Sequence, residues 1–256
     1  MQRIRIAPRS DWQSRCEALG FLYHSVGGKY WDESACYVFN PRQIAQLEQA
    51  TNRLHQMCLE ACQFIVDRNM FNLLHIPDSY VPQIIRSWEQ DAFSIYGRFD
   101  FQYDGVHEPK LLEYNADTPT SLLEAGIVQW QWKEDSCGWA DQFNSIHEHL
   151  MQGWQYSGLP GRQVHFACLK ETEEDLGNVQ YLMETAAAAG IRSSFLHVED
   201  LGWDGDLQRF VDLKNNPVQV LFKLYPWEWM LNDEFGDKLP REAVMLIEPA
   251  WKMMLS

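Results

Sequence analysis

The sequence contains neither a membrane span nor the cysteine pattern of a small secreted domain. No stretch of the 256 residues approaches the ~20 consecutive apolar residues that cross a bilayer. The opening MQRIRIAPRSDWQ has no apolar run of the signal-peptide kind. The six cysteines include no CxxC pair, and a chain of this size does not need disulfide staples. We therefore expect a cytoplasmic protein with reduced thiols.

Basic residues are scarce. Lysine and arginine total 21 against 36 aspartates and glutamates, which gives a net charge of −15 and a pI of about 4.9. Nucleic acids and anionic membranes bind basic surfaces, so this balance argues against both as partners. A cationic substrate would suit the acidity, although ordinary solubility is the favoured explanation.

Three common site motifs are also missing. No GxGxxG follows the first buried strand of the second half, and no GxxxxGK is present, so dinucleotide and P-loop sites are not expected. His147-Glu148-His149 is not HExxH, because its two histidines point to different helix faces. The 46% hydrophobic content is ample for one large domain or two modest ones.

The stretch from 96 to 126 carries the densest chemistry. Polar and aromatic residues alternate along 98–102, which is typical of a strand with an aromatic face toward the core. Asp104-Gly105 indicates a turn, and 110–115 is the predicted return strand, with Leu111, Glu113 and Asn115 on one face.

The register of this hairpin predicts a cation site. If the loop is centred between residues 106 and 107, partner numbers sum to 213, which places Arg98 opposite Asn115 and Asp100 opposite Glu113. Two carboxylates directly across a ladder repel each other, so either Arg98 or a divalent ion must compensate them. Mg²⁺ prefers such hard oxygen ligands together with substrate phosphates.

Helices are expected on both sides of the hairpin. A three- and four-residue apolar repeat predicts a long helix from Pro41 to about Arg68, and 81–88 reads as a short helix. After the hairpin, a helix begins either with Thr118 as N-cap and Pro119 inside, or with a Ser121 and Glu124 capping box. Its free N–H groups would form an anion site or serve only as a cap; both interpretations stay open.

The second half predicts a parallel sheet. Pro160-Gly161 marks a boundary, after which strands at 163–169 and 193–198 flank a helix at 175–189, and 218–224 forms a third strand. The acidic loop 170–175 lies at the carboxyl end of a strand, where it either binds an amine or complements the helix N-terminus. An aromatic loop at 225–229 and a helix from residue 248 complete the chain.

These motifs together resemble a known family. RFDF at 98–101, EYNADTPTSLLEAG at 113–126, EED at 173–175, KLYPWEWM at 223–230 and EPAWK at 248–252 are similar to the glutathionylspermidine synthases. The similarity is strongest to stand-alone bacterial members described as acid–amine ligases, and it covers nearly the whole chain. It implies an ATP-grasp ligase, in which ATP phosphorylates a carboxylate, an amine attacks the acyl phosphate, and an amide forms.

The resemblance also implies nucleotide and metal residues. Arg98 would stabilise charge in the transition state, and Arg98, Phe99 and Asp100 would lie against ATP. Asp100 and Glu113 would bind one Mg²⁺, and Glu113 with Asn115 a second.

The substrate residues implied by the resemblance are Thr118, Thr120, Ser121, Glu173 and Glu174. The two glutamates match residues associated with amine binding. Thr118 and Thr120 are serines in the glutathionylspermidine synthases, and the extra methyl groups argue against an identical substrate. Glutathione as the acid and a polyamine as the amine are the family's best-known pair, and a peptide is a further candidate for the acid, but the sequence names none of them.

The implied fold is α/β and ATP-grasp-like. Residues 1–160 would form a helical and hairpin region that carries the metal and catalytic motif, and 161–256 a Rossmann-like, pre-ATP-grasp βαβ subdomain. The family's nucleotide-clamping lysines and lid would follow Ser256, and the chain ends mid-pattern on Met253-Met254-Leu255. We thus expect a C-terminally truncated form whose lid is absent or incomplete and which is inactive alone. The alternatives are a non-catalytic polyamine- or peptide-binding module and, more weakly, a divalent-metal phosphohydrolase.

Overall fold

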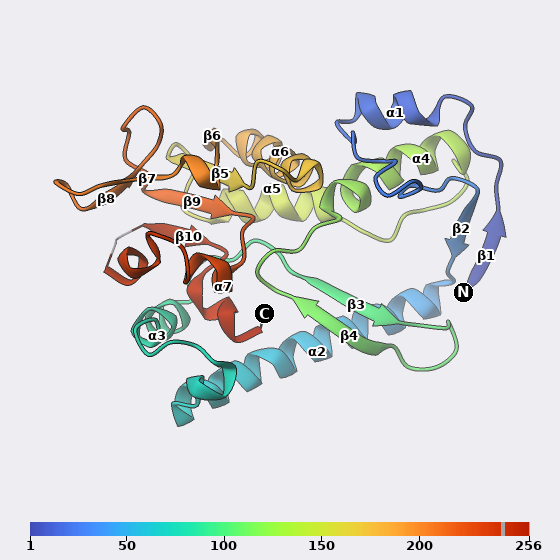
Figure 1. Ribbon diagram of the computed structural model, residues 1–256. Helices are drawn as coiled ribbons and strands as arrows, with labels where there is room; N and C mark the ends of the chain where they lie inside the picture. The colour runs from blue at the N-terminus through green and yellow to red at the C-terminus, as the bar shows by residue number, and fades with distance from the viewer. Residues whose placement is uncertain (242–243, 256) are drawn as a thin grey trace.

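The computed structural model describes residues 1–241 and 244–255 and contains a four-stranded parallel sheet (Figure 1). Its strand order is β10-β9-β5-β6, and neighbouring strands are all parallel, so the class is α/β as predicted. The strands are β5 (Gln163–Cys168), β6 (Arg192–His197), β9 (Val220–Lys223) and β10 (Met245–Ile247).

In the part of the chain that the structure describes, three antiparallel ribbons lie outside this sheet. They pair β1 (Gln2–Arg5) with β2 (Ala35–Val38), β3 (Arg98–Gln102) with β4 (Lys110–Asn115), and β7 (Gly202–Asp204) with β8 (Arg209–Val211).

The α-helices connect and cover these strands. They are α1 (Trp12–Ala18), α2 (Pro41–Arg68), α3 (Val81–Glu89), α4 (Gln129–Ser136), α5 (Ile146–Tyr156), α6 (Glu173–Ala188) and α7 (Trp227–Met230). Short 3-10 segments lie at η1 (Phe71–Leu74), η3 (Val198–Asp200), η4 (Gly236–Arg241) and η5 (Ala250–Leu255), and a π-helical segment at η2 (Glu124–Val128).

The sheet separates two hydrophobic cores, because alternate residues of a strand point to opposite faces. Phe166 and Phe222 face α5 and α6 in one core, where Trp154 packs edge-on against Phe166. Ala167 and Leu221 face the other core, which also holds side chains of α3, α7 and η5. The near-continuous apolar run along β5 therefore follows from burial on both faces.

Helix α2 matches its predicted bounds from Pro41 to Arg68. The Asn40 side chain accepts from the Gln43 N–H while the Gln43 side chain accepts from the Asn40 N–H, which closes a capping box around Pro41. Asn69 ends the helix in the left-handed conformation. Figure 1 shows α2 running alongside the hairpin, and the Tyr103 hydroxyl donates to Gln46 at 2.7 Å.

Two predicted segments near the C-terminus have a different form. The predicted aromatic loop 225–229 overlaps the helix α7, in which the N–H groups of Trp229 and Met230 donate to the Pro226 carbonyl. The predicted helix from residue 248 is the 3-10 segment η5, and Ser256 lies outside the described residues.

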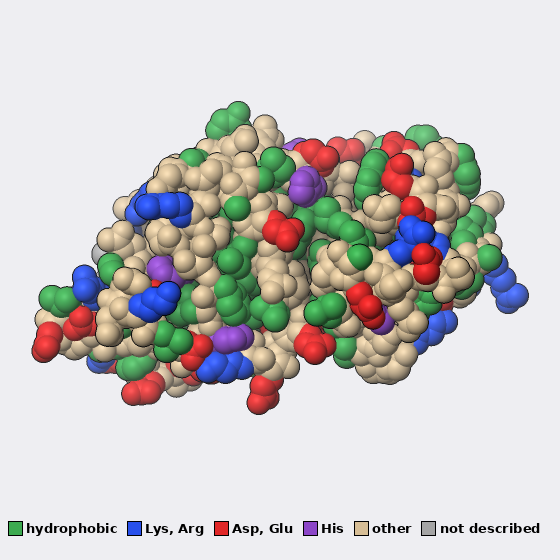
Figure 2. Space-filling view, turned by 90° about the horizontal axis from the view of Figure 1, so that it is seen from above, with side chains coloured by type: hydrophobic (Ala, Val, Ile, Leu, Met, Phe, Trp, Pro, Cys, Tyr) green, Lys and Arg blue, Asp and Glu red, His purple; other side chains and the backbone are tan. Residues whose placement is uncertain are grey.

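Within the described part of the chain, no helix is both long and apolar enough to cross a bilayer. Lysines and arginines form several separate groups, interspersed with acidic and apolar side chains, on the face drawn in Figure 2.

Candidate active site

The hairpin β3–β4 has the predicted register where the chemistry lies. Arg98 pairs with Asn115, and Asp100 pairs with Glu113. The register then shifts, so that Phe101 pairs with Leu111 rather than with Leu112. The extra residue, Leu112, forms a bulge and is 68% exposed. The prediction that Leu111 shares the face of Glu113 is therefore wrong, because the bulge moves Leu111 to the side of Phe101.

The aromatic face of this hairpin is only half-buried. The rings of Phe99 and Tyr114 stack with their centroids 4.0 Å apart, and His55 of α2 packs edge-on against Tyr114. The expectation that this face joins the core is met by a local aromatic layer and not by the two main cores. Because the Phe99 ring lies on this side, Phe99 can offer only its main chain to a ligand on the polar side.

Arg98 neutralises Asp100 through two hydrogen bonds. Its Nε donates to Asp100 Oδ1 at 2.7 Å and its Nη2 to Oδ2 at 3.2 Å. This pairing raises the pKa of Arg98, against the opposing effect of desolvation, and the charges of Glu113 and Glu174 add to the increase. Nη1 lies 3.4 Å from both the carbonyl oxygen and Oγ1 of Thr120.

Glu113 and Asn115 differ in how much of their bonding capacity is used. Glu113 is exposed and has no hydrogen bond or ion pair with any residue that the structure describes. Asn115 closes the turn after β4, because its Oδ1 accepts from the Thr118 N–H at 2.9 Å and its Nδ2 donates to the Thr118 carbonyl at 3.3 Å.

The two carboxylates suit a hard cation. Asp100 and Glu113 are adjacent oxygen donors on one face, which matches a Mg²⁺ that takes one or two carboxylates plus substrate phosphates. The described residues contain no cluster of three His, Cys, Asp or Glu side chains, so a cage made wholly by such groups is not present there. The donor set fits a metal that is shared with a phosphate ligand.

A cavity of about 370 Å³ opens beside Arg98. Its lining includes the polar residues Arg98, Thr120 and Ser121 and, from α5, Ile146 and His149. Ser121 adopts the left-handed conformation, with φ of 65°, which is uncommon for a residue with a side chain. The structure thus brings two predicted substrate residues into one cavity with the predicted catalytic arginine.

The helix after the hairpin begins later than the predicted start at Pro119, and it lacks both predicted caps. Its first helical residue is Leu122, so Thr118 is not its N-cap, and the Ser121 side chain makes no capping bond. The Leu122 N–H instead donates to Asn178 Oδ1 of α6 at 2.8 Å. Glu124 accepts from the Tyr30 hydroxyl at 2.7 Å rather than closing a box. The Leu122 N–H is therefore already used and does not serve the predicted anion site.

The acidic start of α6 lies close to this cavity. Glu174 is half-buried and near enough to Arg98 to contribute to its raised pKa, whereas Glu173 is exposed. Both lie in the first turn of α6, where acidic side chains complement the helix dipole. The position of these residues therefore agrees both with binding of an amine and with stabilisation of the helix N-terminus.

Sequence reasoning missed four buried charges next to the hairpin. Asp117 pairs with Lys223, and Glu248 pairs with Lys252, all with side chains at most 2% exposed. A lysine that ends an apolar strand, as in VLFK at 220–223, is a signal that could have found Lys223.

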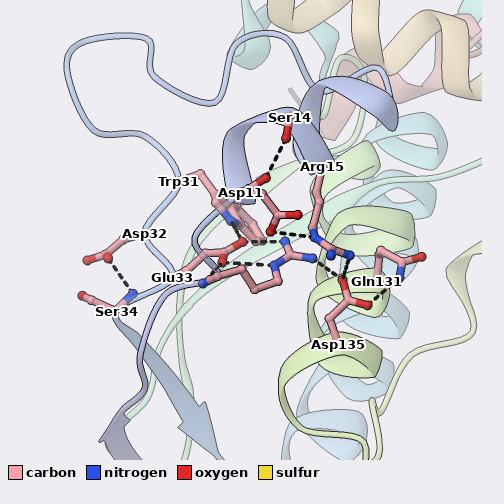
Figure 3. Close-up of polar contacts among 10 residues, drawn as sticks. Asp11, Ser14, Arg15, Trp31, Asp32, Glu33, Ser34, Gln131 and Asp135 are labelled. Atoms are coloured by element: carbon pink, nitrogen blue, oxygen red, sulfur yellow. Dashed lines mark hydrogen bonds and ion pairs between the residues drawn. The ribbon is translucent and has the colours of Figure 1, made fainter.

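A second, partly buried network joins the N-terminal segment to α4. Arg9 donates to Glu33 and to Asp135 of α4, each at 2.5 Å, and Arg15 adds a contact to Asp135 at 3.1 Å (Figure 3). The Glu33 side chain is fully buried, and it also accepts from the Trp31 indole. None of these residues lines the cavity beside Arg98.

Comparisons with known proteins agree with the motifs. The family model described as glutathionylspermidine synthase preATP-grasp matches residues 3–256. A Haemophilus influenzae protein provisionally named an acid–amine ligase is 40% identical over 266 residues, covering 100% of this chain and 67% of its own length. Trypanothione synthetase of Crithidia fasciculata is 31% identical, and the match covers 79% of this chain and 32% of that protein. The bifunctional glutathionylspermidine synthetase/amidase of Escherichia coli is 27% identical, and the match covers 95% of this chain and 44% of that protein.

A solved structure shares the fold. It is a glutathione synthetase-like effector from Globodera pallida in its apo form, with a TM-score of 0.52 and 11% identity, covering 98% of this chain and 64% of that one. The chain thus spans from about a third to about two thirds of the length of the relatives that it matches.

Proposed function

The chain belongs to the glutathionylspermidine synthase family, and we propose that it carries the metal and substrate part of an ATP-dependent carboxylate–amine ligase. The observation that carries this proposal is the cavity beside Arg98, which joins Arg98 to Thr120 and Ser121. The relatives bear the names of acid–amine ligase, trypanothione synthetase and glutathionylspermidine synthetase, which are all names of ligases.

In the proposed reaction, a substrate carboxylate takes the terminal phosphoryl group of ATP, and an amine then displaces phosphate to form an amide. Mg²⁺, when bound, would neutralise the polyphosphate and align the transfer. Asp100 and Glu113 offer carboxylate oxygens for it, and Asn115 offers a side-chain carbonyl. We propose two ions, with Glu113 shared between them.

Arg98 is the proposed catalytic residue. Its guanidinium lines the cavity and is held by Asp100 through Nε and Nη2, so Nη1 lies beside Thr120 and N–H donors remain for a substrate. A fixed guanidinium can donate two hydrogen bonds to the oxygens of a phosphoryl or tetrahedral group, which stabilises charge that develops in the transition state. The main chain at Phe99 and the carboxylate of Asp100 would lie against ATP.

We assign the acid to the segment from Thr118 to Ser121 and the amine to Glu173 and Glu174. The half-buried Glu174 lies near Arg98, so an ammonium group there would be close to the activated acid. Glutathione or a peptide and a polyamine are the substrates we would test first, because two relatives are named for glutathionylspermidine and trypanothione synthesis. A cytoplasmic location is part of the same proposal.

The test is release of ADP by the protein at its natural length, measured with acid, amine and Mg²⁺ present and with each left out in turn. An acid labelled with ¹⁸O in its carboxylate should transfer one labelled oxygen to phosphate, because the acyl phosphate breaks at the carbonyl carbon. Arg98→Ala and Asp100→Ala should abolish turnover, whereas Arg15→Ala, which removes an arginine paired with aspartates outside the cavity, should not.

Retention of turnover by Arg98→Ala and Asp100→Ala, or unlabelled phosphate, contradicts the proposal. Calorimetric binding of a polyamine without Mg²⁺ or ATP, in a protein that releases no ADP, identifies the non-catalytic binding module instead.

A further inference from the structure

Both ends of the hairpin meet the carboxyl edge of the parallel sheet. Tyr96 precedes β3 by two residues, and Asp117 follows β4 by two residues. Lys223 is the last residue of β9, and Glu248 directly follows β10, its neighbour in the sheet. Each of the two strand ends contacts one end of the hairpin.

The first contact holds the segment after β4. Lys223 Nζ donates to Asp117 Oδ1 at 2.5 Å and to the Tyr225 carbonyl at 2.9 Å. The other carboxylate oxygen of Asp117 accepts from the Trp227 N–H at 2.8 Å. Both charged side chains are at most 2% exposed, so every contact is shielded from water.

The second contact holds the segment before β3. Glu248 accepts from the main-chain N–H groups of Ile95 and Tyr96 at 3.1 and 3.2 Å. Lys252 pairs with Glu248 at 2.5 Å and donates to the Tyr96 carbonyl at 2.6 Å. The pair therefore binds both the donor and the acceptor of the Tyr96 main chain.

These two segments build the cavity beside Arg98. Ile95, Tyr96 and Arg98 line one part, and Thr120 and Ser121 line another. The Tyr96 hydroxyl donates to the Pro119 carbonyl at 2.7 Å, which joins the two segments directly. A shift of either ion pair would thus move Arg98 relative to the substrate segment.

A buried ion pair is weak evidence for stability, because desolvation of the two charges offsets their attraction. A protein in which well-packed apolar side chains of similar volume replace such a pair is often equally stable, so the presence of two buried pairs needs another explanation. Unlike apolar contacts, a charge that accepts two main-chain N–H groups fixes their direction.

We propose that Asp117, Lys223, Glu248 and Lys252 are positioning residues, which fix both ends of the hairpin to the sheet and thereby set the place of Arg98 in the cavity. The catalytic consequence rests on the proposed ligase function. The mechanical consequence, a hairpin held rigid by the sheet, does not.

Two charge-free double variants test this, Asp117→Asn with Lys223→Met and Glu248→Gln with Lys252→Met, because each amide keeps an acceptor for the main-chain N–H groups. Replacing both partners avoids an unpaired buried charge, so the melting temperature should stay within roughly 4 °C of the parent protein. Hydrogen exchange should nevertheless become about tenfold faster in β3 and β4 while β5 and β6 are unchanged. The turnover number should fall by up to roughly 10²-fold, because small displacements of a catalytic group are costly.

The matched control removes the buried pair of Arg9 with Glu33, by Arg9→Met with Glu33→Gln. It should change stability by a similar amount but leave hairpin exchange and turnover unchanged. Protection of the Tyr96 and Trp227 amides in the unmodified protein provides a measurement that no folding defect can obscure. These amides should exchange as slowly as those of β5, since both donate to buried carboxylates.

Fast exchange of the Tyr96 and Trp227 amides in the unmodified protein overturns the proposal. Wild-type hydrogen exchange of the hairpin in a folded double variant also overturns it. So does full turnover by a double variant whose melting temperature equals that of the parent protein. If the unmodified protein releases no ADP at all, the ligase function is wrong, and hairpin exchange alone then decides on the positioning.

Discussion

Replacing Arg98 by lysine should separate catalysis from stability. Arg98 makes two hydrogen bonds to Asp100 and two longer contacts of 3.4 Å to Thr120. A lysine keeps the charge and can keep one bond to Asp100. It lacks the planar fork that binds two oxygens at once.

The structure predicts a small loss of stability and a large loss of rate. The side chains of Arg98 and Asp100 are 31% and 38% exposed, so solvent screens their pairing. The lost bond should cost about 1 kcal/mol or less, which lowers the melting temperature of a chain of this size by about 2–4 °C. Removing one donor from a developing charge typically lowers the turnover number by about 10²–10³-fold, or roughly 3–4 kcal/mol.

The assay is amine-dependent ADP release at saturating substrates, with the melting temperature measured on the same samples. Arg15→Lys is the matched control, because Arg15 also contacts aspartates, through Nε at 2.9 Å and Nη1 at 3.1 Å, and lies outside the cavity. It should lose a similar amount of stability and no activity. A rate loss below about tenfold in Arg98→Lys, or an equal loss in the control, would refute the role of the guanidinium.

Three further predictions concern single groups. Glu113→Gln should leave the free energy of unfolding within about 0.5 kcal/mol of the parent, since Glu113 is exposed and makes no hydrogen bond or close ion pair with the described residues. The same variant should need about tenfold more Mg²⁺ for half-maximal turnover, and an unchanged Mg²⁺ requirement would count against Glu113 as a ligand. His107 should titrate by NMR with a pKa above its ordinary value because of its hydrogen bond to Asp104, and Asp104→Asn should remove the increase. The hydrogen bond of protonated His107 to Asp104 therefore stabilises the folded state fully below the unfolded pKa near 6.5, and this contribution is lost as the pH rises through the higher folded pKa. Burial raises the pKa of the Cys62 thiol to about 12, so this thiol should react with a disulfide reagent at pH 8 only after unfolding, later than the half-buried Cys58; equal rates would contradict this burial.

The sequence predicted α2 and β3 because the signals for both lie within a few neighbouring residues. The three- and four-residue apolar repeat, Pro41 and the following turns fix α2 within the chain itself. The alternation along 98–102 likewise predicts β3, and the pairing of Asp100 with Glu113 follows from a turn at the expected place. The register beyond Asp100 could not be predicted, since nothing in the residues identifies Leu112 as the extra residue of a bulge.

The start of the helix after the hairpin illustrates the limit of capping rules. Both predicted caps satisfy local N–H groups with local side chains. The structure instead uses Asn178, 56 residues further along the chain, to accept from the Leu122 N–H. A distant side chain competes with local caps only when the fold has brought it close, which no local pattern encodes.

By itself, the sequence determined the α/β class, the family, and the hairpin that carries Arg98, Asp100, Glu113 and Asn115, because periodicity and turn chemistry act over a few residues. Only the tertiary structure decided which groups surround them. It placed Arg98 in a cavity with Thr120 and Ser121, and it put the four buried charges at the carboxyl edge of the sheet. The physical reason is that ion pairs such as Asp117 with Lys223 form between residues about a hundred positions apart, and only the packing of the sheet against the hairpin brings them within contact.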